Sequence, residues 1–168
     1  MNHKSGKLTG MAESVVQIAS YICERYQKEF GTRIDEMKLH KLLYFTQREC
    51  LIQTGKPMFE EAFSAWKYGP VLVSVRQLYK RDSLRELPSE NVIAKYKKVF
   101  DKVFFLYAPK TSLSLSVLSH NEYSWKHAFS LKNGASDALI DLHDIEKDAE
   151  HVKIRRFLLE KMNVEGNN

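Results

Sequence analysis

The sequence predicts a mainly α-helical domain of the α+β class, a compact bundle of about six to eight helices with a small two- or three-stranded antiparallel sheet. Apolar residues recur at helical spacing over most of the 168-residue chain. Just two short segments, 61–68 and 138–140, have the length and composition of strands. The 43% hydrophobic content and the length are sufficient for one substantial core.

Three parts are expected along the chain. Residues 1–10 are polar, without periodicity, and are predicted to be a flexible lead-in. Residues 11–163 are predicted to form a single domain, and residues 164–168 to fray. No apolar run approaches the roughly 20 residues of a membrane span. With two cysteines and no signal-like segment, we expect a protein of the reducing cytoplasm that does not bind membranes.

Two helices are predicted in the first part of the domain, over residues 12–30 and 35–53. A glycine follows each of them, and glycine suits the left-handed position after a helix. Thr32 and Asp35 are both candidate N-caps of the second helix. Its wide apolar face predicts a central, buried helix; that face contains Leu39, Leu42 and Leu43.

The segment after the second helix is predicted to turn the chain. Residues 61–68 are expected to be extended and to pair with residues 138–140. Pro70 is expected to start a helix over 70–80, because its fixed φ suits a first helical turn. The polar residues 81–89 are predicted to form a loop.

Residues 90–107 have the clearest amphipathic pattern and are predicted to be one helix. Its lysines Lys95, Lys98 and Lys102 fall together on the face away from the core. Three more helices are expected over 112–120, 125–131 and 142–162, the last with a break near Asp148 as an alternative. Their candidate N-caps are, in order, Thr111 or Ser112, Ser124 and Asp141.

Two groups of residues carry a family resemblance. The first is the run Trp66-Lys67-Tyr68-Gly69-Pro70, preceded by the helix residues Lys38-Leu39 and Lys41-Leu42-Leu43-Tyr44 and by Gly55-Lys56-Pro57. The second is Ser119-His120, followed by Trp125. Over residues 15–145 the chain resembles the Panacea domain, also called the SocA-like antitoxin domain, of bacteria and their phages. That family usually has Thr before the His and Pro before the Trp, where this chain has Ser119 and Ser124.

The resemblance implies an antitoxin that neutralises a cognate toxin, encoded by an adjacent gene, through direct protein–protein contact. The contact is expected to come from exposed parts of Lys41, Tyr44, Gln47, Trp66, Lys67 and Tyr68. Structural roles are expected for Leu42, Gly69, Pro70, His120 and Trp125. From the residues alone, the Trp66–Pro70 run fits a structural corner and also a recognition surface, since aromatic and cationic side chains anchor interfaces.

Two other binding functions fit the same sequence. An adaptor would use the same surface to deliver a bound partner to a cytoplasmic protease. A regulator of its own operon would use Lys95, Lys98 and Lys102 to contact DNA phosphates. The formal net charge of +5 permits nucleic-acid binding without requiring it, and a lysine-rich face is also typical of a solvated surface.

Catalytic and metal sites are not expected. The chain has no glycine-rich phosphate loop and no dinucleotide fingerprint. Adjacent Ser119 and His120 do not place the hydroxyl on the imidazole, as a nucleophile and its base require. The spacing of His120, His127, His143 and His151 does not match that of a zinc site. We therefore expect a protein that is not an enzyme and that has no cofactor and no metal ion.

Overall fold

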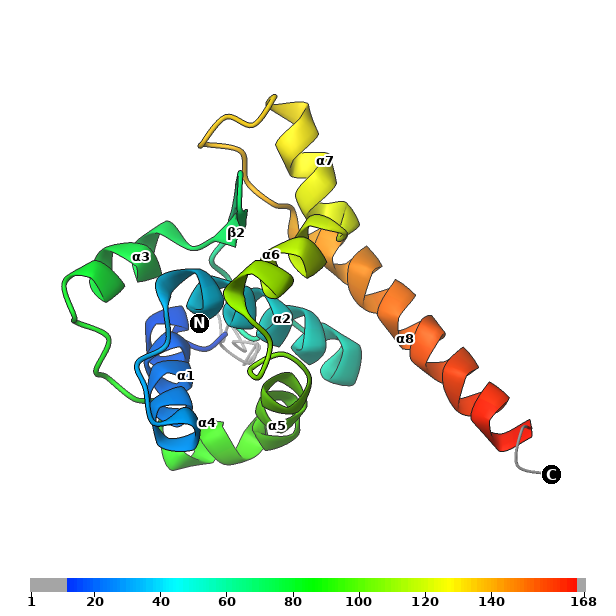
Figure 1. Ribbon diagram of the computed structural model, residues 1–168, viewed down its shortest axis with the longest axis horizontal. Coiled ribbons are helices and arrows are strands. Elements are labelled where there is room, and N and C mark those ends of the chain that lie inside the picture. Colours follow the sequence, from blue (N-terminus) through cyan, green and yellow to red (C-terminus); the bar gives the residue numbers. More distant parts are fainter. Residues whose placement is uncertain (1–11, 166–168) are drawn as a thin grey trace, which may run out of the picture.

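The computed structural model describes residues 12–165. Within this part the chain forms eight helices and one two-stranded sheet, as predicted (Figure 1). The lead-in predicted at 1–10 lies outside the described residues, as do 166–168 of the stretch expected to fray. The elements are α1 (Val15–Phe30), α2 (Glu36–Thr54), β1 (Ser64–Trp66), β2 (Gly69–Val71), α3 (Val73–Lys80), α4 (Glu90–Lys95), α5 (Lys97–Leu106), α6 (Ser112–His120), α7 (Tyr123–Leu131) and α8 (Leu142–Glu165).

Helix α2 is the centre of the fold. It packs against α1, α5, α6, α8 and β2, and every residue from Lys38 to Leu51 is buried. This confirms the predicted central position. It also means that the core surrounds α2 on all sides, so no side of its middle turns remains for solvent.

The predicted helix boundaries are confirmed where a cap fixes them. The Asp35 side chain accepts a hydrogen bond from the Lys38 amide at 2.9 Å at the start of α2. The Thr111 hydroxyl accepts one from the Ser114 amide at 3.1 Å at the start of α6. Asp141 accepts one from the His143 amide at 2.8 Å, beside the first turn of α8. These bonds satisfy amide groups that a helix leaves free at its first turn.

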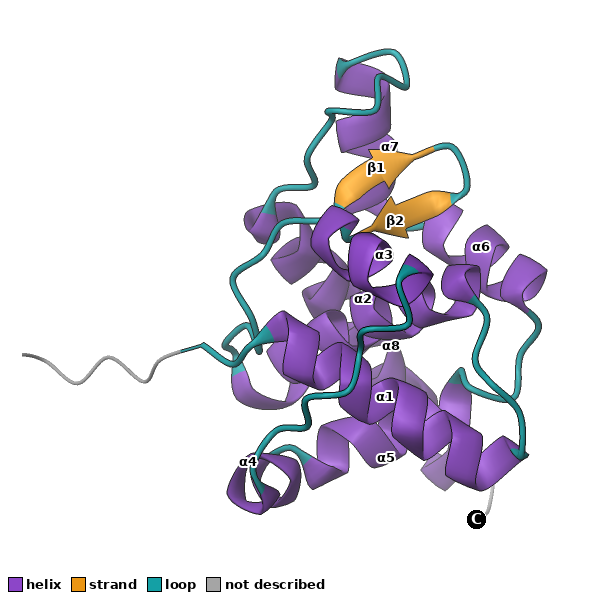
Figure 2. Cartoon of the chain, turned by 90° about the vertical axis from the view of Figure 1, so that its left-hand side faces the viewer, coloured by secondary structure: helices purple, strands orange, loops and turns teal. Residues whose placement is uncertain are grey.

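The small sheet is a hairpin with a third segment beside it (Figure 2). β1 and β2 are antiparallel, with Ser64 opposite Val71 and Trp66 opposite Gly69. The Ala65 amide donates to the Ala138 carbonyl at 2.7 Å, and the Ile140 amide donates to the Phe63 carbonyl at 2.8 Å. The predicted pairing of 138–140 with 61–68 is therefore confirmed, as an isolated bridge.

Pro70 does not start a helix. It lies in β2, opposite Ala65, and α3 begins at Val73. Proline has no amide to donate, and it is tolerated in an edge strand such as β2. The structure thus uses Pro70 to extend the hairpin rather than to begin the following helix.

The helix predicted over 90–107 is two helices. α4 and α5 meet at Tyr96, whose φ of −103° and ψ of 13° interrupt the helical path. Tyr96 is buried at this bend, while Lys95 and Lys97 on either side are exposed. Burial of the Tyr96 ring thus favours two helices with a bend over the single regular helix that the apolar spacing predicts.

Ser124 does not cap α7, and α8 is not broken near Asp148. Glu122 is at the N-cap position of α7 and makes no capping bond with its side chain. Asp148, in the unbroken α8, accepts instead from the Tyr123 and Ser124 amides, each at 2.9 Å. The same carboxylate accepts from the Tyr44 hydroxyl at 3.2 Å. A residue of one helix thus satisfies the free amides of another.

Replacing Asp148 by Ala removes this shared acceptor. We expect the free energy of unfolding to fall by about 2–3 kcal/mol, because the Tyr123 and Ser124 amides lose their acceptor and the Tyr44 hydroxyl loses one of its two partners. Urea denaturation followed by circular dichroism measures the change. Asp137→Ala, at an exposed carboxylate, is the control and should change the unfolding free energy by less than about 0.5 kcal/mol. Equal effects of the two substitutions would contradict this role of Asp148.

Candidate partner-binding site

The motif residues meet at the β1–β2 hairpin. Three alternate carbonyl groups of this hairpin accept hydrogen bonds from side chains of three different helices. These bonds run from Trp125 Nε1 of α7 to Trp66 O at 2.9 Å, from Ser116 Oγ of α6 to Tyr68 O at 2.8 Å, and from Lys41 Nζ of α2 to Pro70 O at 3.1 Å. The hairpin backbone is therefore fixed to the helical body on both strands and at the turn.

Lys41 is the charged member of this group of donors. Its side chain is 1% exposed, and its ammonium group reaches the Pro70 carbonyl. Burial lowers the pKa of Lys41 from 10.5 to about 8, and the nearby Asp35 partly opposes that shift. Lys41 thus positions the hairpin and is not available to touch a partner directly.

Gly69 lets the hairpin approach α2 and α6 closely. Its φ is +108°, a conformation that side-chain-bearing residues rarely adopt. A Cβ atom there would lie 2.5 Å from Ser119 Oγ and 2.6 Å from Lys41 Cε. Ser119 is fully buried and donates its hydroxyl to the Ser116 carbonyl at 2.8 Å. Both the backbone conformation and the available space therefore require glycine.

An aromatic stack supports the hairpin from α6 and α7. The His120 and Trp125 rings are 4.2 Å apart between centroids, and Trp125 stacks on Phe129 at 4.7 Å. His120 is half-buried, and its Nε2 atom has no hydrogen-bond partner among the described residues. Desolvation lowers the pKa of His120, as does Lys41, against a backbone hydrogen bond at Lys67. We conclude that His120 is a neutral packing partner of Trp125.

The exposed end of the hairpin consists of Trp66, Lys67 and Tyr68, here called the hairpin tip. Lys67 is exposed, and Tyr68 is 59% exposed. The Lys67 ammonium is 5.5 Å from the centroid of the Tyr68 ring. Trp66 is half-buried, with its Nε1 donating to the Ser136 carbonyl at 3.0 Å. The tip thus presents a cation and two aromatic rings on a backbone that is held in place.

The predicted exposure of Tyr44 and Gln47 is wrong, as it is for Lys41. The Tyr44 hydroxyl bonds to Ser124 Oγ at 2.8 Å, and burial raises its pKa well above the usual value. Gln47 donates to the Phe59 carbonyl at 2.7 Å and accepts from the Met58 amide at 2.8 Å. Because α2 is enclosed on all sides, its polar side chains turn to loops and neighbouring helices instead of to solvent.

Arg48 adds a buried ion pair that the motifs do not indicate. Its guanidinium group pairs with Glu122 and donates to the Tyr107 hydroxyl at 2.6 Å. Burial raises the pKa of Glu122, and Arg48 opposes this shift. The pair borders a polar cavity of about 290 Å³ between α2, α6 and α8. The sequence places Arg48 seven residues after Lys41, on the same side of the helix. It does not predict the ion pair, because Glu122 is 74 residues away in the chain.

Lys95, Lys98 and Lys102 do not share one helix. Lys95 belongs to α4 and the other two to α5, on either side of the bend at Tyr96. All three are exposed, and Lys95 Nζ is 3.9 Å from the Glu13 carboxylate. The single basic helical face expected from the sequence is therefore not formed.

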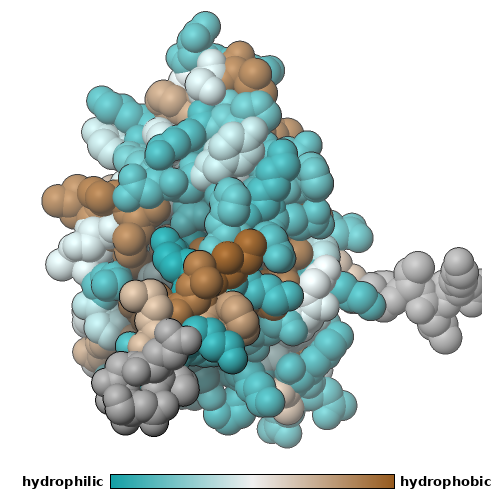
Figure 3. Space-filling model, turned by 90° about the vertical axis from the view of Figure 1, so that its right-hand side faces the viewer, coloured by the Kyte–Doolittle hydropathy of each residue, from teal (hydrophilic) through white to brown (hydrophobic). Residues whose placement is uncertain are grey.

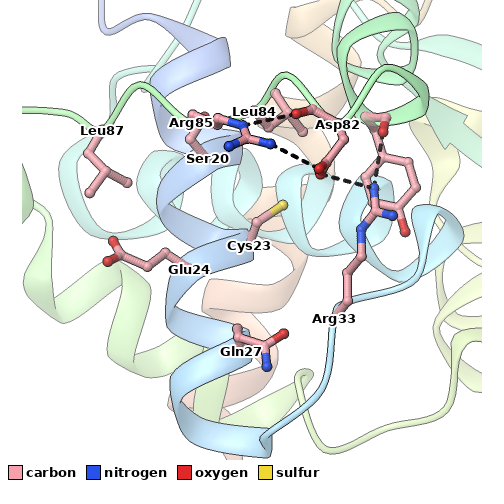
Figure 4. Close-up of a pocket in the computed structure, with 10 residues that line it drawn as sticks. Ser20, Cys23, Glu24, Gln27, Arg33, Asp82, Leu84, Arg85 and Leu87 are labelled. Atoms are coloured by element: carbon pink, nitrogen blue, oxygen red, sulfur yellow. Dashed lines mark hydrogen bonds and ion pairs between the residues drawn. The ribbon is translucent and has the colours of Figure 1, made fainter.

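A separate cavity of about 440 Å³ opens between α1 and the loop 81–89 (Figure 4). It is lined by polar and charged side chains and by Leu84 and Leu87, and it contains Cys23, whose pKa burial raises to about 11. That thiol is protonated at neutral pH and is a poor nucleophile. The cavity includes none of the hairpin residues, so it is distinct from the candidate site.

Within residues 12–165 no three His, Cys, Asp or Glu side chains are arranged to hold a metal ion. None of the helices described between those residues combines the length and apolar character needed to cross a membrane.

A family model described as "Antitoxin SocA-like, Panacea domain" matches residues 39–126. The chain belongs to this family. Antitoxin SocA of Caulobacter vibrioides (strain NA1000 / CB15N) is 45% identical over 38 residues, which are 23% of this chain and 20% of that protein. The alignment thus spans about a fifth of the curated relative's length. No solved structure matches the chain.

The matched range contains the residues that hold the hairpin. It begins in α2 just before Lys41 and ends in α7 just after Trp125. The matched range thus includes the hairpin and the side chains of α2, α6 and α7 that hold it, together with α3, α4 and α5. Helix α8 lies outside the matched range.

Ser124 uses both its amide and its hydroxyl. The amide donates to Asp148 at 2.9 Å, and the hydroxyl bonds to Tyr44 at 2.8 Å. The proline that the resemblance leads us to expect here would supply neither group. Ser124 therefore connects α2, α7 and α8 in a way that a proline would not.

Gly69→Ala tests the close approach of the hairpin. We expect the unfolding free energy to fall by about 3 kcal/mol or more, because backbone strain adds to a steric clash. Gly31→Ala is a matched control: Gly31 also has a positive φ, +71°, but a Cβ there meets nothing within 4 Å. That substitution should lower the free energy of unfolding by about 1–2 kcal/mol. Equal losses, measured by urea denaturation, would show that the contacts at Gly69 do not matter.

Lys41→Met tests the buried ammonium. In the native chain the folded state loses the Lys41 proton near pH 8, whereas the unfolded state keeps it to about 10.5. The unfolded state thus binds more protons between these values, so this group makes stability rise with pH, by up to about 1.4 kcal/mol per pH unit.

The measurement is the difference in unfolding free energy between native protein and Lys41→Met from pH 7 to 10.5. This difference should shift in favour of the native protein as pH rises above 8. Cys23 has the opposite influence, since its raised pKa lowers stability as pH rises from 9 to 11, but it is present in both proteins and cancels. A difference that does not vary with pH would contradict the lowered pKa of Lys41.

Proposed function

We propose that this protein is an antitoxin that binds and neutralises a cognate toxin encoded by an adjacent gene, and that the hairpin tip forms part of the contact. Membership of the SocA-like antitoxin family supports the first part. The observation that supports the second is the convergence of the family motifs on the hairpin, with Lys67 and Tyr68 exposed at its end.

The tip has the properties of an interface anchor. Aromatic side chains are enriched at the sites that dominate binding energy. A tip held by hydrogen bonds to three helices loses little conformational freedom on binding, which favours affinity. Lys41, Tyr44 and Gln47 would act indirectly, through the backbone and helix positions that they fix. The protein would then work by binding, without catalysis.

Co-expression tests neutralisation. The neighbouring gene is expressed in a bacterium alone and together with this protein, and growth, co-purification and the amount of the neighbour's product are measured. We expect toxicity alone, growth together, and a stable complex with an unchanged amount of toxin. Loss of the toxin during rescue would instead support delivery to a protease. A harmless neighbour, or toxicity without rescue, would contradict the proposed function.

Lys67→Glu tests the tip. This exposed substitution should leave the fold intact and weaken toxin binding at least tenfold, because it reverses the charge of the proposed contact residue. Isothermal titration calorimetry with purified toxin gives the affinity, and thermal denaturation confirms folding. Lys98→Glu, an equal charge change on α5, is the control and should bind normally. Full affinity in Lys67→Glu would exclude the tip from the interface.

A further inference from the structure

Helix α8 forms one wall of the cavity that Arg48 borders, here called the Arg48 cavity. The cavity holds about 290 Å³ and lies between α2, α6 and α8, with Tyr107 at the end of α5. This volume is near the lower end of the range for small-molecule sites. None of the hairpin-tip residues lines the cavity, so it is separate from the candidate partner-binding site.

The buried arginine of this cavity has an unused hydrogen-bond donor. Arg48 is 3% exposed. Two of its nitrogen atoms are engaged, one by the Glu122 carboxylate and one by the Tyr107 hydroxyl. The third, Nε, is buried and has no partner among the described residues. Because a buried donor without a partner is costly and rare in folded proteins, this atom points to a group that completes the site.

The charges of the cavity wall favour an anion as that group. Glu122 is paired with Arg48, and Asp148 accepts from two amides at the start of α7, at 2.9 Å each. Both carboxylates are therefore compensated. Burial raises the pKa of Glu122, and the charges of Arg48 and Arg155 oppose this shift, so Arg155 acts on the same cavity. Arg155 is exposed and forms no ion pair within residues 12–165. It is thus the cation of the wall that an anion would compensate.

The rest of the lining combines polar and apolar side chains. Asn121 and His151 are exposed, and their side chains make no hydrogen bond with any other described residue. The apolar part consists of Phe45, Leu118 and Val152. Hydrophobic and hydrophilic surfaces also lie next to one another on the side of the molecule from which α8 projects (Figure 3). This lining suits a ligand that has one charged group and a small apolar body.

We propose that the Arg48 cavity binds a small carboxylate that carries an apolar group of a few carbons, either a free organic acid or the C-terminal carboxylate of a protein chain. The Arg155 guanidinium pairs with the carboxylate, since the planar fork of arginine matches that group. Arg48 Nε supplies a further donor. A carboxylate is favoured over the more highly charged phosphate, because Glu122 and Asp148 lie in the same wall.

The apolar group of the ligand packs on the apolar part of the lining. Phe45 and Val152 are buried there, and Leu118 is half-buried, so these side chains form a fixed surface. Covering it removes further apolar area from water, which adds to the affinity of the ion pair. The inference is independent of toxin neutralisation, because it uses no residue of the hairpin tip.

NMR spectroscopy of the isotope-labelled full chain tests the site, because the Nε–H group of Arg48 can be followed by its own signal. The chain is titrated with isocaproate and with N-acetyl-leucine. Both have the carboxylate and the branched apolar group, and the second adds an amide that stands for the preceding peptide bond. We expect a saturable shift of the Arg48 signal, with a dissociation constant of about 1 mM or tighter. N-acetyl-leucinamide, which lacks the charge, is the matched control and should bind at least tenfold more weakly.

The substitution Arg155→Gln tests the proposed ion pair. It should raise the dissociation constant of both acids at least tenfold, because it removes the cation that pairs with the carboxylate. Thermal denaturation confirms that the variant is folded. Arg81→Gln changes an exposed arginine that does not line the cavity, and it should leave the affinity unchanged.

The two acids also distinguish the source of the carboxylate. Tighter binding of N-acetyl-leucine assigns the cavity to a protein C-terminus, and tighter binding of isocaproate assigns it to a free acid. Three results would overturn the proposal: no saturable shift with either acid, equal affinity for N-acetyl-leucinamide, or full affinity in Arg155→Gln. Binding of inorganic phosphate without binding of either acid would overturn the assignment to a carboxylate.

Discussion

The burial of every residue of α2 from Lys38 to Leu51 is the constraint on which the rest of the structure depends. A buried helix that carries lysine, glutamine, arginine and glutamate must provide partners for their polar atoms, because an unpaired buried polar group is costly. Those partners come from distant parts of the chain: Lys41 reaches Pro70, Gln47 reaches Phe59, and Glu49 reaches Arg156. The side chains of one helix thus determine where the hairpin, the 58–59 segment and α8 lie.

The hairpin illustrates how this constraint shapes the candidate site. Its backbone carbonyls accept side-chain hydrogen bonds from α2, α6 and α7, so its tip is rigidly placed while Lys67 and Tyr68 remain exposed. The family match begins and ends close to these donors.

Much of the fold could be predicted from local sequence signals. The caps at Asp35 and Thr111 could be predicted because side-chain capping acts over a few residues, and the extended form of residues 138–140 could be predicted from their composition. Contacts between distant parts of the chain, which override local preferences, could not be predicted in this way. Lys41 and Tyr44 follow a spacing that permits an exposed strip, yet both are buried because the groups that satisfy them lie 29 and 80 or more residues away. The bend at Tyr96 and the capping of α7 by Asp148 likewise depend on contacts between elements.

Hydrogen–deuterium exchange tests the central claim most directly. Amide exchange of the full chain is measured with and without the purified product of the neighbouring gene. The account predicts slow exchange of β1 and β2 in the free protein, and further protection of residues 66–69 in the complex. A hairpin that exchanges freely when unbound, or a complex that protects other surfaces and leaves residues 66–69 unchanged, would contradict it.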